Sequence, residues 1–346
     1  MTALPHLPDQ PAGVAWPTRE WPTGPLPAEV DRARLEAALD HAFTDPPAAD
    51  IGQAHSLVIV QGGLLVLERY APDHGPEATA QSWSMAKSIT QALAGLLVGD
   101  GLVDIFAPAD VPEWKGAGDP RAKITLDQLM RMSSGLAFVE VYSPEQPSDV
   151  IEMLFGRGKD DVAGFAASFP LAHPPASHFA YSSGTTNIIC RCLARALRAD
   201  GEAFAAFMRD RLFAPLGMTS ASPRFDEAGT FIGSSFCFAT PRDFARFGLL
   251  YLRGGVWDGA RLLPEGWVDY ARTATYQQPG CVEGPYGASW WLDLAGPGSF
   301  SANGYQGQHI VLCPDRDLII VRNGVTPEAD QPALKVWLAE LAALFS

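Results

Sequence analysis

Strand-like segments occur at both ends of the chain, and helical patterns fill the long stretch between them. The strand candidates are residues 56–61, 64–69, 288–292, 308–312 and 318–322. Gly62-Gly63 between the first two predicts a hairpin, and Pro314-Asp315-Arg316-Asp317 between the last two predicts a turn. This arrangement predicts an α+β fold, in which an antiparallel sheet is built from both chain ends and a helical domain is inserted between them.

Helical periodicity supports the same division. It predicts an amphipathic helix over 28–43, a helix that is apolar on nearly every side over 84–98, and a closing helix over 333–345. Between residues 125 and 216 the helical pattern is interrupted by proline and glycine, which is typical of several short helices. The predicted divisions are a proline-rich arm (1–27), a sheet domain flanked by the first and last helices (28–85 and 235–346) and a mainly helical domain (86–234).

The composition is that of a globular protein and argues against several classes of partner. Of the 346 residues, 47% are hydrophobic and 18% are charged, and the formal net charge is −14. An acidic chain without a basic cluster is unsuited to nucleic acid or an anionic membrane, and no segment approaches the roughly 18 apolar residues of a membrane span. The first residues lack a basic segment followed by an apolar one, so we expect no export signal and a cytoplasmic protein. The five cysteines are scattered without zinc-site spacing, so we expect free thiols and no metal.

Ser84 and Lys87 stand three residues apart where the helix over 84–98 is predicted to begin. Residues at this spacing share one face of a helix, and free N–H groups at a helix N-terminus favour developing negative charge. A serine nucleophile with a lysine as its proton acceptor needs such an arrangement. Because the helix is expected to be buried, the lysine would need polar partners or a lowered pKa. The alternative is an ordinary N-cap serine beside a solvated lysine.

Two further stretches are candidates for the same site. Phe179-Ala180-Tyr181-Ser182-Ser183-Gly184 leads directly into a helix, where the Tyr181 hydroxyl could point into a cleft. The alternative is a core tyrosine whose hydroxyl is hydrogen bonded. Asn303-Gly304-Tyr305-Gln306-Gly307-Gln308 precedes a strand, and its glycines allow the backbone to approach a ligand closely. The chain has no G-x-S-x-G, H-E-x-x-H, P-loop or G-x-G-x-x-G motif.

In their order along the chain, these three stretches resemble the motifs of the serine β-lactamase and penicillin-binding protein superfamily. The likeness is greatest to class C β-lactamase-type serine hydrolases, including esterases and 6-aminohexanoate-dimer hydrolases. It extends from about residue 56 to the end and includes the stretches 124–136, 212–218 and 239–248. The resemblance implies a β-lactamase-like fold and a serine hydrolase that uses water and no cofactor.

The resemblance also implies a role for each matching residue. Ser84 would be the nucleophile that forms an acyl-enzyme, and Lys87 would take or relay its proton. Tyr181 would share the acid–base work by protonating the leaving group and activating the deacylating water. The backbone N–H groups of Ser84 and Gln308 would form the oxyanion hole.

Two motif positions depart from those of the β-lactamases. Ser183 stands where an asparagine is usual, and Tyr305-Gln306-Gly307 replaces the usual Lys-Thr-Gly. Without that lysine, a substrate carboxylate would lose a charge-assisted contact of about 1–3 kcal/mol. We therefore predict hydrolysis of a small ester or linear amide, with a weak β-lactamase or D-Ala-type peptidase as an alternative. A catalytically idle binding or assembly protein is a second alternative, against which the retained Ser84, Lys87 and Tyr181 argue.

Substrate contacts are predicted from position alone. The loop Glu140-Val141-Tyr142-Ser143-Pro144 precedes the second motif and is a candidate wall or lid, with a solvated surface loop as the alternative. Trp83, Trp290 and Trp291 are candidates for an acyl pocket, with core packing as the alternative. The predicted substrate-binding residues are Ser183, Tyr305, Gly307, Tyr142 and Asp149. The expected partner is a small-molecule ester or amide, and the pattern leaves the oligomeric state open.

Overall fold

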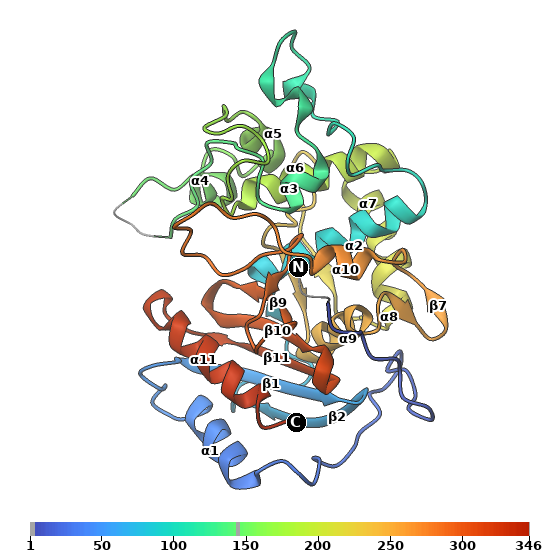
Figure 1. Ribbon diagram of the computed structural model, residues 1–346, viewed down its shortest axis with the longest axis vertical. Helices are drawn as coiled ribbons and strands as arrows, with labels where there is room; N and C mark the ends of the chain where they lie inside the picture. Colours follow the sequence, from blue (N-terminus) through green and yellow to red (C-terminus); the bar gives the residue numbers. More distant parts are fainter. Residues whose placement is uncertain (1–3, 143–145, 346) are drawn as a thin grey trace.

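The computed structural model describes residues 4–142 and 146–345, and its central element is a six-stranded antiparallel sheet. The strands follow the spatial order β2-β1-β11-β10-β9-β8 (Figure 1). Their bounds are β1 Gln53–Gln61, β2 Leu64–Tyr70, β8 Trp291–Leu292, β9 Phe300–Gly304, β10 Gln308–Cys313 and β11 Leu318–Val325. β1 pairs with β11, so that Val58 lies opposite Val321 and the two chain ends meet within one sheet. The prediction of an antiparallel sheet from both ends is confirmed.

Short turns join β1 to β2 and β10 to β11, and each pair forms an antiparallel hairpin. Gly62 and Gly63 join β1 to β2 with φ values of 59° and 74°, the left-handed backbone that a two-residue hairpin turn requires. Asp317 closes the β10–β11 turn with a φ of 45°, a conformation that aspartate tolerates better than most residues.

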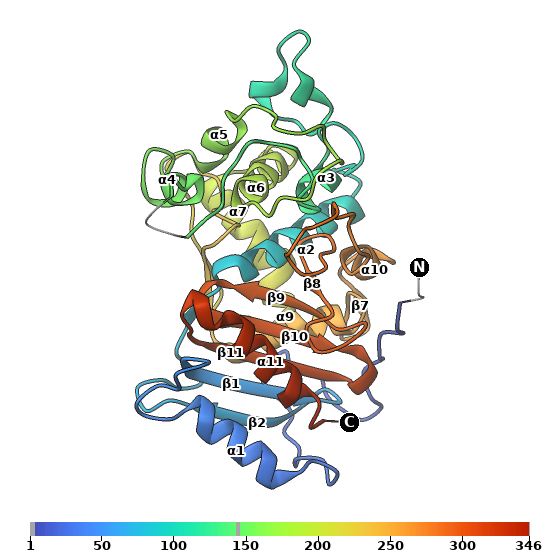
Figure 2. The same ribbon diagram turned by 60° about the vertical axis from the view of Figure 1, so that its left-hand side comes forward.

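Helices cover both faces of the sheet, as Figures 1 and 2 show. On one face, α1 (Arg32–Ala42) and α11 (Gln331–Ala342) bury Leu35, Leu39 and Leu338 against inward-facing strand residues such as Ile320. On the other face, α9 (Pro241–Leu252) packs against β1, β10 and β11. Thr240 caps α9 by accepting a hydrogen bond from the Asp243 N–H, and Pro241 occupies the first helical turn. The first and last helices therefore flank the sheet as predicted.

The helix α2 (Ala86–Gly99) lies between the sheet and the remaining helices (Figure 2). Twelve of its 14 residues are buried, which confirms the prediction of an apolar helix enclosed on nearly every side. In the described part of the chain, no helix combines the length and apolar character needed to cross a membrane. The predicted start at Ser84 is corrected, because the α-helix begins two residues later and a short 3₁₀ turn, η1 (Trp83–Met85), precedes it.

The short helices of the central segment lie beyond the β8–β9 edge of the sheet (Figure 2). They are α3 Leu126–Met130, α4 Asp149–Phe155, α5 Val162–Ala167, α6 Ser183–Leu197 and α7 Gly201–Met208. A π-helical turn at Arg209–Phe213 leads from α7 to α8 (Ala214–Leu216), which lies against α9. α10 (Trp267–Ala271) follows α9. Thr125 and Gln128 form a capping box at the start of α3, in which each side chain accepts the other residue's backbone N–H.

The strands near the C-terminal end differ from the prediction in two places. The run 288–292 pairs only as β8, because Ser289 has a φ of 60° and breaks the extended backbone. β9 was not predicted, since its sequence Phe-Ser-Ala-Asn-Gly is small and polar and has weak strand propensity. It forms because it lies between β8 and β10, which satisfy its backbone groups. Two small sheets, β3 (Ala80–Gln81) with β5 (Cys237–Ala239) and β4 (Ser222–Pro223), and β6 (Val256–Trp257) with β7 (Ala260–Arg261), were also not predicted.

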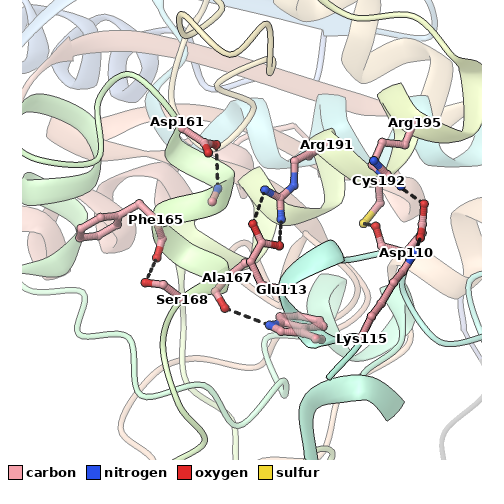
Figure 3. Close-up of polar contacts among 12 residues, drawn as sticks. Asp110, Glu113, Lys115, Asp161, Phe165, Ala167, Ser168, Arg191, Cys192 and Arg195 are labelled. Carbon is pink, nitrogen blue, oxygen red and sulfur yellow. Dashed lines mark hydrogen bonds and ion pairs between the residues drawn. The ribbon is translucent and has the colours of Figure 1, made fainter. Parts of the chain in front are cut away.

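Polar contacts fasten the C-terminal half of α6 to the loop before α3 (Figure 3). Arg191 donates two hydrogen bonds to Glu113, at 2.9 and 2.6 Å, and Arg195 donates one to Asp110 at 2.8 Å. The paired Arg191–Glu113 geometry restricts rotation as well as distance. α6 is therefore held at its far end, while its first turn reaches the site described below.

The five cysteines are free thiols, and four of them are buried. Burial raises the pKa of Cys190, Cys237 and Cys313 to about 12. Such thiols stay protonated at neutral pH and behave as small apolar side chains.

Candidate active site

Ser84 lies in the turn η1, whose backbone is strained at the preceding residue. Trp83 has a φ of 44°, which is uncommon for a bulky residue, and its ring packs against Phe236 and Tyr305 with centroid separations of 6.0 and 5.4 Å. The turn leaves Ser84 partly exposed, while the next residues enter the core. No acceptor among the described residues engages the Ser84 N–H. Both the hydroxyl and the N–H of Ser84 are therefore available at one point of the surface.

Lys87 is buried in the first turn of α2, with 1% of its surface exposed. Its Nζ lies 2.9 Å from Ser84 Oγ, 3.0 Å from Ser183 Oγ and 3.0 Å from the Ser234 carbonyl oxygen. Burial lowers the pKa of Lys87 to about 8. Lys87 therefore has both features expected of a buried lysine, namely polar partners and a lowered pKa.

Tyr181 lies immediately before α6 and faces the same point. Lys87 Nζ is 4.9 Å from the centroid of its ring, which also packs against Tyr286 and Trp291. Burial raises the pKa of the Tyr181 hydroxyl, and hydrogen bonding with Ser84 opposes this shift. Tyr181, which is distant in the sequence, is thus brought together with Ser84 and Lys87.

A carboxylate of the candidate lid loop, to which the sequence assigned no role at the nucleophile, completes this polar cluster. Glu140 accepts a short hydrogen bond from the Ser183 N–H, and its other oxygen accepts the Ser183 O–H at 2.8 Å and the Tyr142 O–H at 2.7 Å. The Ser183 hydroxyl in turn accepts the hydrogen bond from Lys87. Glu140 appears in the sequence as one acidic residue in a polar loop, 43 positions before Ser183, so no local pattern could have identified the contact.

The third predicted stretch forms the end of β9 and the turn η5 (Tyr305–Gly307). Gly304 lies against η1 so closely that a Cβ atom added there would be 2.3 Å from the Ser82 carbonyl oxygen. Tyr305 follows it, and its ring stacks on Tyr142 with a centroid separation of 5.0 Å. Gly304 and Tyr305 line the same cavity as Ser84 and Tyr181.

Gly307 and Gln308 lie on the other side of this turn. Gly307 has a φ of 82°, and a Cβ atom added there would be 2.3 Å from Arg322 Nη1. The Gln308 side chain is buried, where it donates to the Gly324 carbonyl oxygen at 2.7 Å. Gln308 lines a separate cavity with His55 and Asn323, and not the cavities that contain Ser84. This placement does not support the prediction that the Gln308 N–H faces the nucleophile.

Arg322 explains how the turn η5 is held. Its guanidinium group is buried, and burial lowers its pKa to about 9. It donates hydrogen bonds to the carbonyl oxygens of Gly307 at 2.8 Å, Gln306 at 3.3 Å and Gln53 at 3.1 Å. A buried cation that is bonded to backbone carbonyls on both sides ties the turn to β1.

Two cavities meet at Ser84. The larger, of about 690 Å³, lies toward α4 and is lined by Trp83, Phe155 and Asp149 among others. The smaller, of about 150 Å³, lies toward α11 and is lined among others by Tyr181, Trp291, His309 and Lys335. Three residues, Ser84, Tyr142 and Tyr305, line both cavities.

The remaining candidate substrate contacts include Asp149, Trp290 and the candidate lid. The Asp149 carboxylate borders the larger cavity but also accepts the Val139 N–H at 2.8 Å, which gives it a structural role at the start of α4. Trp290 is fully buried in the core, as the alternative assignment proposed. Of the candidate lid, Ser143 and Pro144 lie outside the described residues. Within residues 4–142 and 146–345, no group of three or more His, Cys, Asp or Glu side chains is arranged to hold a metal ion.

Comparison with known proteins bears on the family and the fold of this chain. A family model described as Beta-lactamase matches residues 41–343. The 6-aminohexanoate-dimer hydrolase of Paenarthrobacter ureafaciens is 24% identical over 324 residues, covering 86% of this chain and 76% of the relative. A solved Bacillus anthracis structure that carries the provisional name 6-aminohexanoate-dimer hydrolase has a TM-score of 0.76 and 22% identity, over 99% of this chain and 92% of that one. A family VIII carboxylesterase has a TM-score of 0.67 and 14% identity, over 93% and 98% of the two chains. At these identities the structural likeness establishes the fold.

Proposed function

Since the chain belongs to the Beta-lactamase family and is a hydrolase, we propose that it cleaves a small ester or a linear amide through an acyl-Ser84 intermediate. The observation that carries this proposal is the buried Lys87 amine, 2.9 Å from the Ser84 hydroxyl. An ordinary lysine is almost fully protonated at neutral pH and cannot accept a proton. A pKa of about 8 leaves a useful fraction of Lys87 as the free amine.

In the acylation step, the Lys87 free amine accepts the Ser84 proton while Ser84 Oγ attacks the substrate carbonyl carbon. The raised pKa of Tyr181 keeps its hydroxyl protonated at neutral pH, so that it can act as an acid. Tyr181 donates its proton to the leaving alcohol or amine as the carbonyl–leaving-group bond breaks. The Lys87 ammonium, next to the Tyr181 ring, restores the tyrosine proton, and the acyl group stays on Ser84.

In the deacylation step, a water molecule takes the place of the leaving group beside Tyr181. It loses its proton to the Lys87–Tyr181 pair as its oxygen attacks the acyl carbon. The bond to Ser84 Oγ then breaks, and the pair returns a proton to the serine. The products are a carboxylic acid and the free alcohol or amine, and no cofactor enters the reaction.

For the oxyanion hole, we propose the N–H groups of Ser84 and Tyr305 in place of Ser84 and Gln308. Tyr305 follows Gly304, whose backbone touches η1, and both residues line the cavity of Ser84 and Tyr181. Gln308 lines neither cavity at the nucleophile. Two backbone donors on rigid elements can stabilise the oxyanion without reorganising.

Gly304→Ala is expected to lower kcat/KM by about 10²–10³-fold, the usual cost of losing one oxyanion donor. A Cβ atom at this position would meet the Ser82 carbonyl oxygen at 2.3 Å, so the strand must move away from Ser84 and carry the Tyr305 N–H with it. Ester hydrolysis measures the effect. Gly116→Ala is the matched control, because an added Cβ atom there has no neighbour within 4 Å. An unchanged rate in Gly304→Ala would exclude Tyr305 as a donor.

We assign the two halves of the substrate to the two cavities at Ser84. Tyr181, which protonates the leaving group, lines the smaller cavity and not the larger one. The leaving group therefore occupies the smaller cavity, and the acyl group extends into the larger one. Because Trp83, Phe155 and Tyr305 line the larger cavity, it favours an apolar acyl chain.

Phe155→Ala is expected to lower kcat/KM about tenfold for a long acyl chain and to leave acetyl esters unchanged. Phe155 is exposed and lines the larger cavity. We expect a long acyl chain to contact its ring and an acetyl group not to reach it. A series of p-nitrophenyl esters from acetyl to decanoyl measures the difference. Phe106→Ala, at another exposed phenylalanine outside both cavities, is the control. Equal effects on short and long acyl chains would contradict the assignment.

The direct test of the mechanism is to trap the acyl-enzyme. Intact mass measured shortly after mixing with a slowly deacylating ester should show one added acyl group, and peptide mapping should place it on Ser84. A penicillin included in parallel tests the β-lactamase or peptidase alternative, since a stable adduct on Ser84 would favour it. If no adduct forms with either reagent and no ester or amide is hydrolysed, the proposed function is wrong.

A further inference from the structure

Glu140 is linked to Lys87 through Ser183, whose hydroxyl donates to Glu140 and accepts from Lys87. It has no contact with Ser84 or Lys87 themselves, but its two oxygens hold both polar hydrogens of Ser183. Ser183 is in turn one of the three polar partners of Lys87 Nζ. Resting on the proposed function of Ser84 and Lys87, we infer that Glu140 is a positioning residue, which directs the lone pair of the Lys87 free amine at the Ser84 hydroxyl.

The inference follows from counting donors and acceptors. A carboxylate only accepts, so the Ser183 O–H must point at Glu140 and Ser183 Oγ can only accept from Lys87. The Ser234 carbonyl oxygen also accepts only. A neutral amine has two hydrogens and one lone pair, and these two acceptors take both hydrogens. The lone pair is then left for the third partner, Ser84 Oγ, which is 2.9 Å away.

The same count of donors and acceptors predicts the effect of replacing Glu140 with glutamine. The Ser183 N–H is fixed by the first turn of α6 and needs an acceptor, so the oxygen of a glutamine would stay opposite it. The glutamine NH₂ group would then face Ser183 Oγ as a donor. Ser183 would have to turn its own proton toward Lys87 Nζ. That proton would occupy the lone pair that Ser84 needs.

The charge of Glu140 has a second and separate effect. Its negative charge raises the pKa of Lys87, against the larger lowering caused by burial. The other titratable groups near Lys87 are Tyr181 and Cys190, whose raised pKa values keep them uncharged near neutral pH. Glu283 lies near Glu140 and Tyr181, and its pKa is raised as well. Removing the charge at 140 should therefore lower the pKa of Lys87.

The test is the pH dependence of kcat/KM for Glu140→Gln on an ester that the parent hydrolyses. The plateau is expected to fall about tenfold, a fraction of the 10²–10⁴-fold that a general base contributes. The midpoint of the rising limb is expected to move to lower pH, because Lys87 loses its proton more readily. Glu113→Gln is the matched control, since Glu113 also bonds to α6 but at Arg191, two turns beyond Ser183 (Figure 3). It should change neither the plateau nor the midpoint.

Ser183→Ala separates the two effects of Glu140. Without the Ser183 hydroxyl nothing can turn a proton toward the lone pair, so adding Glu140→Gln should cause little further loss in the plateau. The shift of the midpoint should persist in the double variant, because it depends on charge alone. A plateau loss for Glu140→Gln that is as large in the Ser183→Ala background would overturn the inference. So would a Glu140→Gln plateau equal to that of the parent.

A measurement without substrate tests the charge effect of Glu140 separately from the proposed function. The chain has only five lysines, so ¹³C labelling at lysine Cε allows the Lys87 signal to be assigned by its loss in Lys87→Met. The Lys87 titration midpoint should lie at lower pH in Glu140→Gln than in the parent. An unchanged midpoint would contradict the charge effect, whereas absent hydrolysis in the parent would contradict the proposed function.

Discussion

Ser84→Ala is expected to lower kcat/KM for ester hydrolysis by about 10⁴-fold or more, the usual result of removing a nucleophile from a serine hydrolase. The loss should come from removal of the attacking oxygen and not from unfolding of the protein. Ser84 is partly exposed and loses only one oxygen atom, so the thermal unfolding midpoint should stay within about 2 °C of that of the parent. Initial rates on p-nitrophenyl acetate and on a linear amide measure the loss, and differential scanning calorimetry measures the stability.

Ser168→Ala is the matched control for this substitution. Ser168 is an exposed serine whose hydroxyl donates a 2.7 Å hydrogen bond to the Phe165 carbonyl oxygen (Figure 3). Its replacement should leave the rate unchanged. If Ser84→Ala kept more than a few per cent of the parent rate, another group would be the nucleophile and the acyl-Ser84 mechanism would be wrong.

Lys87→Met is the second substitution with a large expected effect. It should lower kcat/KM by about 10²–10⁴-fold, the contribution of a general base. Methionine has a similar length and keeps the buried site filled, so the loss should come from proton transfer and not from collapse of α2. The parent should show a rising limb of kcat/KM with a midpoint near pH 8, and this limb should be absent from the residual activity of the variant. Lys159→Met, at an exposed lysine, is the control.

The stability of Lys87→Met should depend on pH in a defined direction. In the parent the folded-state pKa of Lys87, about 8, lies below its ordinary value of 10.5. Between these values the unfolded chain binds more protons than the folded one, so the parent gains stability as pH rises through this interval. Below pH 8 the parent carries the full cost of burying the ammonium group, and the variant does not. The free energy of unfolding of the variant relative to the parent should therefore fall as pH rises from about 8 to 10.5. If the difference in unfolding free energy between variant and parent did not change with pH over this interval, the pKa of Lys87 would not be lowered in the folded protein.

The local features of this protein could be read from the sequence. Gly62-Gly63 predicts its hairpin because few other residues adopt left-handed backbone at two successive positions. The apolar run after Lys87 predicts a buried helix, which α2 is. Ser84, Lys87 and Tyr181 could be selected because each belongs to a short motif, and the structure places all three together.

Other features depend on contacts between distant segments. β9 has a weak strand sequence and forms only because β8 and β10 pair with it. Gly304 and Gly307 are equally plausible in the sequence as the glycine beside the nucleophile. The approach of Gly304 to Ser82 and the cavities that each residue lines distinguish them, and they support our proposal of Tyr305 instead of Gln308 as the oxyanion donor.

The sequence by itself therefore predicted the kind of chemistry, because Ser84, Lys87 and Tyr181 match short motifs of the family. The tertiary structure alone decided how these groups are arranged relative to one another. It placed Glu140 against Ser183, 43 positions away, and it divided the space at Ser84 into a larger and a smaller cavity. The physical reason is that hydrogen-bond direction and cavity shape are properties of packed segments, which no single stretch of the chain encodes.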